Sequence, residues 1–385
     1  MTGVRVDVQP GVLKWAVHRA GWDETTVERK APDFESWVDG QKKPTFRQIE
    51  KFARDTHTPF GLLFLSEPPV DRLPIPDMRT IGNQQIREPS ADLLETVLIC
   101  QRRQDWYRDY AKDRGMGEVQ IVGSAAHGSD VLDTAASIRD DLRFGVEQRK
   151  SFSGWEEALR HLLDAADQLG VLVMVNGVVG SDSSRKLDVD EFRGFALADP
   201  VAPLIFINGA DTKAAQIFTV IHELAHIWLG SSAVSDASPS LGSDTGEERW
   251  CNCIAAEVLV PLDHLATTYS GTPGDEELER LAKIYRVSTL VVLRRIYDLG
   301  GMPFELFQDR YATVYGRLMD ILRRKKAKGG GNFYSTQRRR LSPTFASAVF
   351  TSTLSGETSF RDGYQLLGVR SHETFMKLGE QSEGH

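Results

Sequence analysis

Two histidines and one acid interrupt an apolar segment in the middle of the chain. The segment Gln216–Gly230 reads Gln-Ile-Phe-Thr-Val-Ile-His-Glu-Leu-Ala-His-Ile-Trp-Leu-Gly. With about 3.6 residues per helical turn, His222 and His226 project from one face, so both imidazoles can reach a single metal ion. Glu223 is rotated from His222 by about 100°, where its carboxylate can act on a metal-bound water. The spacing therefore predicts half of a zinc site, with Glu223 as its general base.

The alternative is that this His-Glu-x-x-His pattern arose by chance, as short motifs do, and that both histidines are core residues satisfied by backbone carbonyls. The chain has nine histidines in 385 residues, and this pair lies among apolar side chains. A chance arrangement would bury two imidazoles and a carboxylate without compensation, which is costly. We therefore interpret the motif as a metal site.

A catalytic zinc needs a third protein ligand and one open position. The helix predicted to begin near Glu247 is the natural source. Glu248 and Asn252 are four residues apart on one face, so Glu248 can bind the metal while Asn252 bonds the outer nitrogen of a ligand histidine. Glu247 is the competing ligand, although its neighbour one turn on, Cys251, would support it less well. A further alternative is that both acids only complement the helix dipole.

Length and composition indicate an ordinary globular protein. A chain of 385 residues suits two or three domains, and its 41% hydrophobic and 26% charged residues are typical of soluble proteins. It has no apolar run of about 18 residues and no signal-peptide pattern, which predicts a cytoplasmic protein without a membrane segment. A net charge of -8 disfavours nonspecific binding to polyanions. The cysteines are too few and wrongly spaced for a disulfide framework: Cys100, Cys251 and Cys253.

The periodicity of hydrophobic residues, together with the glycines and prolines that end helices, divides the chain into four parts. Residues 1–66 read as short helices separated by glycines and prolines, and residues 67–91 as a Pro-rich connector with four prolines between Glu67 and Asp77. In residues 92–300, helices and a few short strands surround the metal helix. Residues 301–385 read as a helical region of unknown role. The predicted fold class is α+β and mostly helical, with an all-α N-terminal domain.

The last part contains the main concentration of basic residues, in Arg323–Lys328 and Gln337–Arg340. A solvated helix end accounts for most of it, since cations also suit a helix C-terminus. The alternative is a contact with nucleic acid or an acidic peptide, in which Phe333 and Tyr334 stack.

The motifs together resemble a known family. Phe218–His226, followed by Glu248–Pro261, is similar to the ImmA/IrrE family of bacterial and phage zinc metallopeptidases, whose core is gluzincin-like. That resemblance implies His222, His226 and Glu248 as zinc ligands and Glu223 as general base. It also implies a protein substrate, a helix-turn-helix repressor or antitoxin whose cleavage relieves repression. Two departures leave the chemistry untouched: Val260 stands where methionine is common, and Cys251 where alanine is usual.

The N-terminal helices and the connector also resemble the longer members of that family, which carry a helix-turn-helix module of the XRE type. The recognition helix would be Asp33–Val38, but Asp33, Glu35 and Asp39 are acids where a reader of the major groove favours Arg, Lys, Asn or Gln. Phosphate contacts could come from nearby cations: Lys42, Lys43 and Arg47. We therefore expect DNA binding to be weak, and expect the module to make protein contacts instead.

The predicted mechanism is hydrolysis of a peptide bond. Zinc lowers the pKa of its water, and Glu223 takes the proton and passes it to the leaving amine. A further donor to the oxyanion is expected, for which His264 and Tyr269 are candidates. The rival hypothesis is a DNA-binding regulator whose zinc domain is a sensor or an inactive scaffold. The oligomeric state, the scissile bond and the activating signal are not specified by the sequence.

Overall fold

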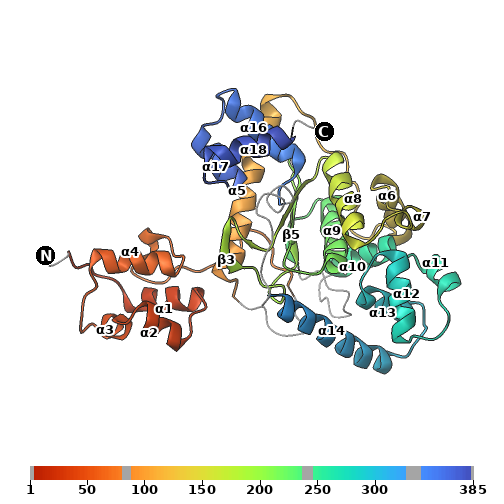
Figure 1. Ribbon diagram of the computed structural model, residues 1–385, viewed down its shortest axis with the longest axis horizontal. Coiled ribbons are helices and arrows are strands. Elements are labelled where there is room, and N and C mark those ends of the chain that lie inside the picture. Colours follow the sequence, from red (N-terminus) through yellow and green to blue (C-terminus); the bar gives the residue numbers. More distant parts are fainter. Residues whose placement is uncertain (1–3, 80–87, 236–245, 327–339, 383–385) are drawn as a thin grey trace. The chain divides into compact units, whose positions relative to one another are not determined.

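The computed structural model describes residues 4–79, 88–235, 246–326 and 340–382. The chain forms two compact units (Figure 1). Unit 1 comprises Met1–Pro74 and Arg87–Val97, and unit 2 comprises Ile75–Ile86 and Leu98–His385. The long helix α5 (Ala91–Asp113) begins in unit 1 and continues into unit 2. Among the described helices, none has the length and apolar character required to cross a membrane.

Unit 1 is helical apart from its connecting segments. Its short elements follow one another closely: α1 (Pro10–Arg19), α2 (Glu24–Lys30), α3 (Phe34–Val38), α4 (Phe46–Asp55) and the 3-10 helix η1 (Phe60–Phe64). The side chain of Asp23 caps α2, and Thr45 with Gln48 forms a capping box on α4. Phe52 of α4 lies at the centre of the core, in contact with the rings of Trp22, Phe34 and Trp37.

Unit 2 contains a small mixed sheet with the strand order β1-β5-β4-β6. Its strands are β1 (Leu172–Asn176), β4 (Gly194–Leu197), β5 (Leu204–Asn208) and β6 (Ala233–Ser235). β1 runs parallel to β5, whereas β4 is antiparallel to both of its neighbours, β5 and β6. A separate two-stranded sheet pairs β2 (Val178–Val179) with β3 (Asp182–Lys186). This sheet among many helices confirms the predicted α+β class.

Helices surround the sheet of unit 2. In chain order they are α6 (Val131–Asp141), α7 (Val146–Arg149), α8 (Trp155–Gln168), α9 (Lys213–Leu229), α10 (Gly246–Leu259), α11 (Leu262–Thr268), α12 (Asp275–Tyr285), α13 (Thr289–Asp298), α14 (Phe304–Lys326), α16 (Pro343–Leu354), α17 (Phe360–Leu367) and α18 (His372–Ser382). The central helix is α9, which packs against α8, α10, β4 and β5 (Figure 1). Residues 217–228 of α9 are all buried, so the core encloses this helix around its whole circumference.

The C-terminal helices of unit 2 form a bundle of their own around aromatic side chains. Phe350 of α16 and Phe375 of α18 lie 5.1 Å apart between ring centroids, and Tyr364 of α17 contacts Phe375. The bundle is attached to α5, where Arg103 donates a hydrogen bond to a carbonyl of α17, that of Leu366. Parts of the two predicted basic stretches, residues 327–328 and 337–339, lie outside the described residues, as do Phe333 and Tyr334.

Three arginines from separate elements bind the last carbonyls of α10 and the carbonyl of Val260, which directly follows the helix. Arg139 donates to the carbonyl of Glu257, Arg149 to that of Leu259 and Arg295 to that of Val260. Arg149 is completely buried and also donates to the carbonyl of Tyr285 at 2.9 Å. Burial lowers the pKa of Arg149 to about 9. These guanidinium groups satisfy carbonyls that a helix end leaves without partners, and their charge favours a helix C-terminus.

Replacing Arg149 with methionine is expected to lower the free energy of unfolding by about 1–3 kcal/mol, because buried carbonyls would lose their donor. Urea titration followed by tryptophan fluorescence measures this change. The matched control is Lys150→Met, since Lys150 is exposed and pairs only with Glu147 among the contacts described. Equal stability of the two variants would mean that Arg149 does not support α10.

Candidate active site

The helix α9 is fixed at both ends by local signals. The side chain of Thr212 accepts a hydrogen bond from the backbone N–H of Ala215, which caps the N-terminus. Gly230 ends the helix in the left-handed region, with φ of 70°. Between these ends, His222, Glu223 and His226 are all completely buried. The sequence thus places three ionisable groups inside the core, where they require specific partners.

The two histidines converge with Glu248, which lies in the first turn of α10. The Nε2 atoms of His222 and His226 are 3.3 Å apart. Each lies close to one carboxylate oxygen of Glu248, at 3.3 Å for His222 and 3.2 Å for His226. Zinc bonds of about 2.0–2.2 Å at tetrahedral angles separate ligand atoms by about 3.3–3.6 Å. The three side chains therefore fit a zinc ion, with a fourth position left for another ligand.

The charge state of Glu248 agrees with such a role. Burial would raise the pKa of Glu248, but His222 and His226 outweigh it and lower that pKa to about 2. The carboxylate is ionised at neutral pH, as a metal ligand must be. Packing of α10 against α9 brings the two elements together, although Glu248 follows His226 only after a long loop.

Glu247 lies behind His226 rather than among the three converging groups. Its Oε1 is 3.1 Å from Nδ1 of His226 and accepts a hydrogen bond from Ser231. This places Glu247 where an outer partner would orient a ligand histidine. The predicted bond from Asn252 to an outer histidine nitrogen is not formed. Oδ1 of Asn252 and Nδ1 of His222 are both buried without a hydrogen-bond partner among the described residues.

One carboxylate oxygen of Glu223 accepts a hydrogen bond, and the other accepts none among the described residues. Its Oε1 accepts a hydrogen bond from the hydroxyl of Ser235 in β6. Its Oε2 is buried and has no hydrogen-bond partner among the described residues. Burial raises the pKa of Glu223 to about 7, in spite of the neighbouring histidines. A carboxylate with this pKa suits proton transfer near neutral pH.

Gly194 in β4 allows Glu223 to approach the sheet. A Cβ atom at this position would lie 2.7 Å from Oε1 of Glu223, 2.7 Å from Cγ2 of Thr219 and 2.8 Å from the carbonyl oxygen of Phe206. Two of these three neighbours are on the buried helix and one is backbone, so none can move away freely. A glycine within a strand can mark such a close approach, and this signal was present in the sequence.

If Glu223 acts as the predicted general base, Gly194→Ala is expected to displace it and to reduce peptide-bond cleavage by about 100-fold, because a shift of about 1 Å in a catalytic group has that effect. Zinc content should stay at the wild-type level, since no metal-site atom lies among the nearest neighbours of that Cβ. The measurement is the cleavage rate together with elemental analysis. Ala196→Gly, in the same strand, is the control for altered strand stability. Wild-type activity in Gly194→Ala would contradict this account.

The two residues predicted as oxyanion donors make their contacts elsewhere. Nδ1 of His264 lies 2.7 Å from the hydroxyl of Tyr285. Tyr269 packs beside Gly301, and its hydroxyl is buried without a hydrogen-bond partner among the described residues. The described contacts place neither side chain against the converging histidines.

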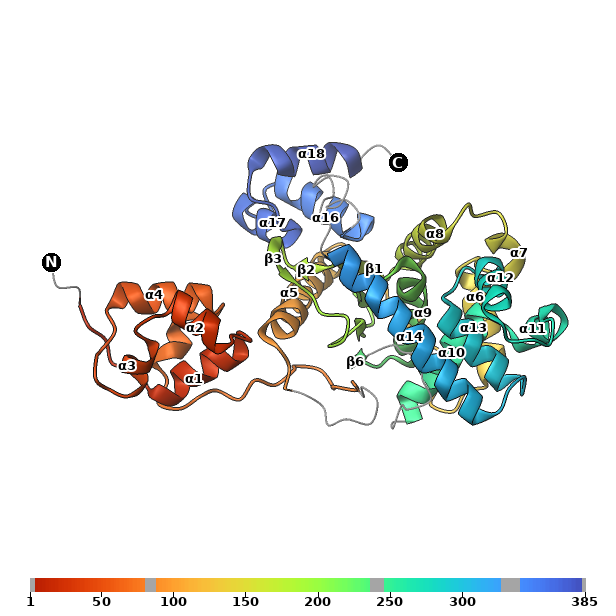
Figure 2. The ribbon, with the colours of Figure 1, turned by 60° about the horizontal axis from the view of Figure 1, so that its bottom comes forward.

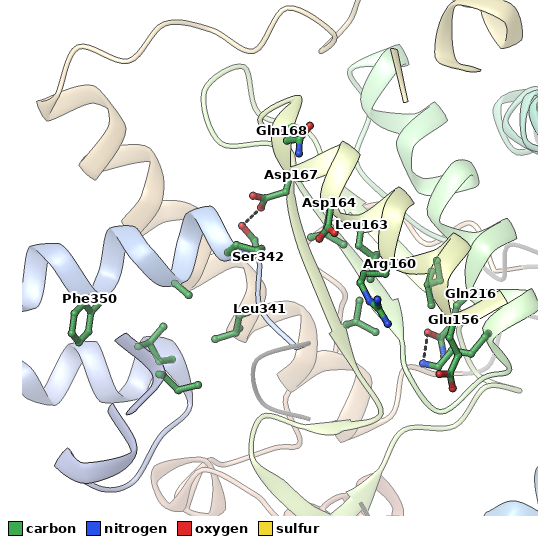
Figure 3. Close-up of a pocket in the computed structure, with 18 of the residues that line it drawn as sticks. Glu156, Arg160, Leu163, Asp164, Asp167, Gln168, Gln216, Leu341, Ser342 and Phe350 are labelled. Carbon is green, nitrogen blue, oxygen red and sulfur yellow. Dashed lines mark hydrogen bonds between the residues drawn. The ribbon is translucent and has the colours of Figure 1, made fainter. Parts of the chain in front are cut away.

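A cavity of about 610 Å³ lies apart from these residues, between α8, β1 and the C-terminal helices (Figure 3). Its lining is largely apolar and includes Val173, Val175 and Phe350. At its border, Asp167 accepts a hydrogen bond from Ser342 (Figure 3). The cavity touches the first turn of α9 at Lys213 and Gln216, but none of the converging residues lines it.

Comparison with known families supports the class of metallopeptidases. Residues 166–297 match the model of the IrrE N-terminal-like domain, a peptidase family, over about a third of the chain. The match contains both α9 and α10 and supports the predicted relation to ImmA/IrrE metallopeptidases. Residues 341–381 match a domain of unknown function (DUF8813). Searches of curated proteins and of solved structures gave no match.

Proposed function

We propose that the protein is a zinc-dependent, site-specific endopeptidase. His222, His226 and Glu248 would hold the metal, and Glu223 would act as general base. The observation that carries this proposal is the convergence of three buried ligand atoms within 4.8 Å of one another. Glu223 directly follows His222 in α9, and its Oε2 has no hydrogen-bond partner among the described residues. The match to a peptidase family over the same residues supports it.

A bound zinc ion would supply a Lewis acid that polarises the scissile carbonyl and lowers the pKa of a coordinated water. Glu223 would accept a proton on Oε2 and then transfer it to the nitrogen of the leaving amine. Ser235 would hold Oε1, so that Oε2 keeps a fixed direction during both transfers. Glu247 would orient His226 through Nδ1.

The proposed substrate is a helix-turn-helix repressor or antitoxin, with unit 1 serving as a docking module. In unit 1, Lys42 lies 2.8 Å from the carboxylate of Asp33, and the amide of Gln48 lies 3.0 Å from it. These groups are therefore engaged inside the unit, which weakens the case for base recognition by α3. Unit 1 would then contact the protein substrate rather than DNA.

The test is incubation of the zinc-loaded protein with helix-turn-helix proteins encoded beside its gene, followed by mass spectrometry. Cleavage at one defined bond supports the proposal. Specific binding of the protein to operator DNA, with no cleavage of any of these proteins, would instead favour a DNA-binding regulator with an inactive zinc domain.

A further inference from the structure

The outer edge of β6 is already occupied by another part of the chain. β6 is the last strand in the order β1-β5-β4-β6, and β4 pairs with its inner edge. At the outer edge, the N–H of Val234 donates to the carbonyl of Pro76 and the N–H of Met78 donates to the carbonyl of Val234, both at 2.9 Å. Asp77 and Val234 form a parallel bridge. We call residues 75–79 the strap.

The strap lies on the strand that positions the proposed general base. Ser235 directly follows Val234 and donates its hydroxyl hydrogen bond to Glu223. All three residues of β6 are buried. The strap and β6, which is labelled in Figure 2, both belong to unit 2, so their pairing is internal to the unit that contains the site.

Arg79 anchors the end of the strap. Its guanidinium group is 4% exposed and binds the carboxylate of Asp77 through two atoms, at 2.7 and 2.6 Å. It also lies 3.3 Å from a carboxylate oxygen of Glu191, which is outside the strap. Bidentate pairs of this kind fix geometry as well as charge. At the other end Pro76 has no N–H, as is common in edge segments.

We propose that the strap occupies, in the same chain, the edge to which an extended segment of the protein substrate must bind. This inference rests on the proposed function, and it adds that the enzyme is latent until the strap leaves. An exposed strand edge binds extended peptides through backbone hydrogen bonds. The strap blocks that edge with two backbone hydrogen bonds in parallel pairing, which is slightly weaker per residue than antiparallel pairing. A protein partner can therefore compete for it.

The test uses Met78→Pro, which removes the N–H that bonds to Val234, with Met78→Ala as the matched control that keeps it. The full-length, zinc-loaded proteins are titrated with a dansylated tripeptide hydroxamate, a probe that reports binding without turnover. Met78→Pro is expected to bind this probe about five- to tenfold more tightly than wild type, the effect of one backbone hydrogen bond. Met78→Ala should stay within about twofold of wild type. Hydrogen exchange at Val234 measures release of the strap.

Unchanged affinity in Met78→Pro would overturn the proposal, and so would unchanged protection of Val234 in that variant. If Met78→Pro does not fold, Arg79→Met provides a second route, because it removes the anchor and leaves the backbone intact. Failure of the proposed function would look different. If Met78→Pro binds the probe more tightly but neither form cleaves any protein, the peptidase function is excluded. The inference that the strap blocks the outer edge of β6 would still stand.

Discussion

Replacing Glu223 with glutamine is expected to slow peptide-bond cleavage by orders of magnitude while the zinc content stays unchanged. Glutamine has nearly the same size and shape, but its amide cannot accept the proton that the carboxylate takes. General-base catalysis typically contributes about 10²–10⁴-fold to a rate, so the loss should be of that order. Because Glu223 is not among the three converging groups, metal binding should survive. The measurement is the cleavage rate of the identified substrate, with elemental analysis of the same sample.

The control for this experiment is Glu156→Gln, which makes the same chemical change at an exposed position of α8. It should cleave at the wild-type rate. A Glu223→Gln variant that also cleaves at that rate would show that the proton acceptor is a different group, and the proposed mechanism would have to be abandoned.

The second large effect is expected in metal content. The double variant His222→Ala/His226→Ala should lose zinc altogether, whereas wild type purified without chelator should contain about one zinc per chain. Glu248→Gln should also bind zinc more weakly, because it removes a charged ligand. Glu247→Gln should have a smaller effect, a loss of about 10- to 100-fold in affinity, as is usual for outer partners of a ligand. Zinc competition with a chromophoric chelator measures all three.

Full zinc occupancy of the double variant would refute the assignment of the site. Which of the two acids, Glu247 or Glu248, binds the metal directly is a separate question. If Glu247→Gln loses more zinc affinity than Glu248→Gln, then Glu247 is the third ligand and the observed arrangement must change when metal binds.

Local signals in the sequence were sufficient for most helices. Helical periodicity and local start and stop signals predicted α3 one residue early, at Asp33, and α9 within three residues of its N-terminus. A few short strands around the metal helix were also predicted, and the sheet of unit 2 agrees with this. The spacing within α9 and along α10 was enough to nominate His222, His226 and Glu248, because helix geometry converts sequence separation directly into direction.

Elements that depend on long-range pairing could not be found in this way. β6 lies in a segment that reads as a polar loop, and β2 and β3 lie in one that reads as turns. Each becomes a strand only through partners elsewhere in the chain, since strand preference depends strongly on context. The contact of Ser235 with Glu223 and the strap on Val234 therefore had no local signature.

Helical spacing also fails to specify side-chain partners. Glu248 and Asn252 share a face of α10, as predicted, yet the outer nitrogen of His226 meets Glu247 instead. Residues on one helical face can differ in direction by one rotamer, and the loop between α9 and α10 decides which acid meets which histidine. Which acid meets which histidine depends on how α9 and α10 pack together, and this packing has no local pattern in the sequence.

The arginines at the end of α10 bear on when the site can form during synthesis. Arg139 and Arg149 precede α10 in the chain, but Arg295 lies well after it, in α13. At about 5–20 residues per second, the ribosome needs a few seconds after Glu248 to make Arg295, and longer for α13 to leave the exit tunnel. During that interval one of the three arginines is missing from the end of α10. The nascent chain then contains both histidines, but the helix that carries Glu248 still lacks part of its stabilisation. We therefore expect the proposed metal site to become fully ordered only after α13 has been made.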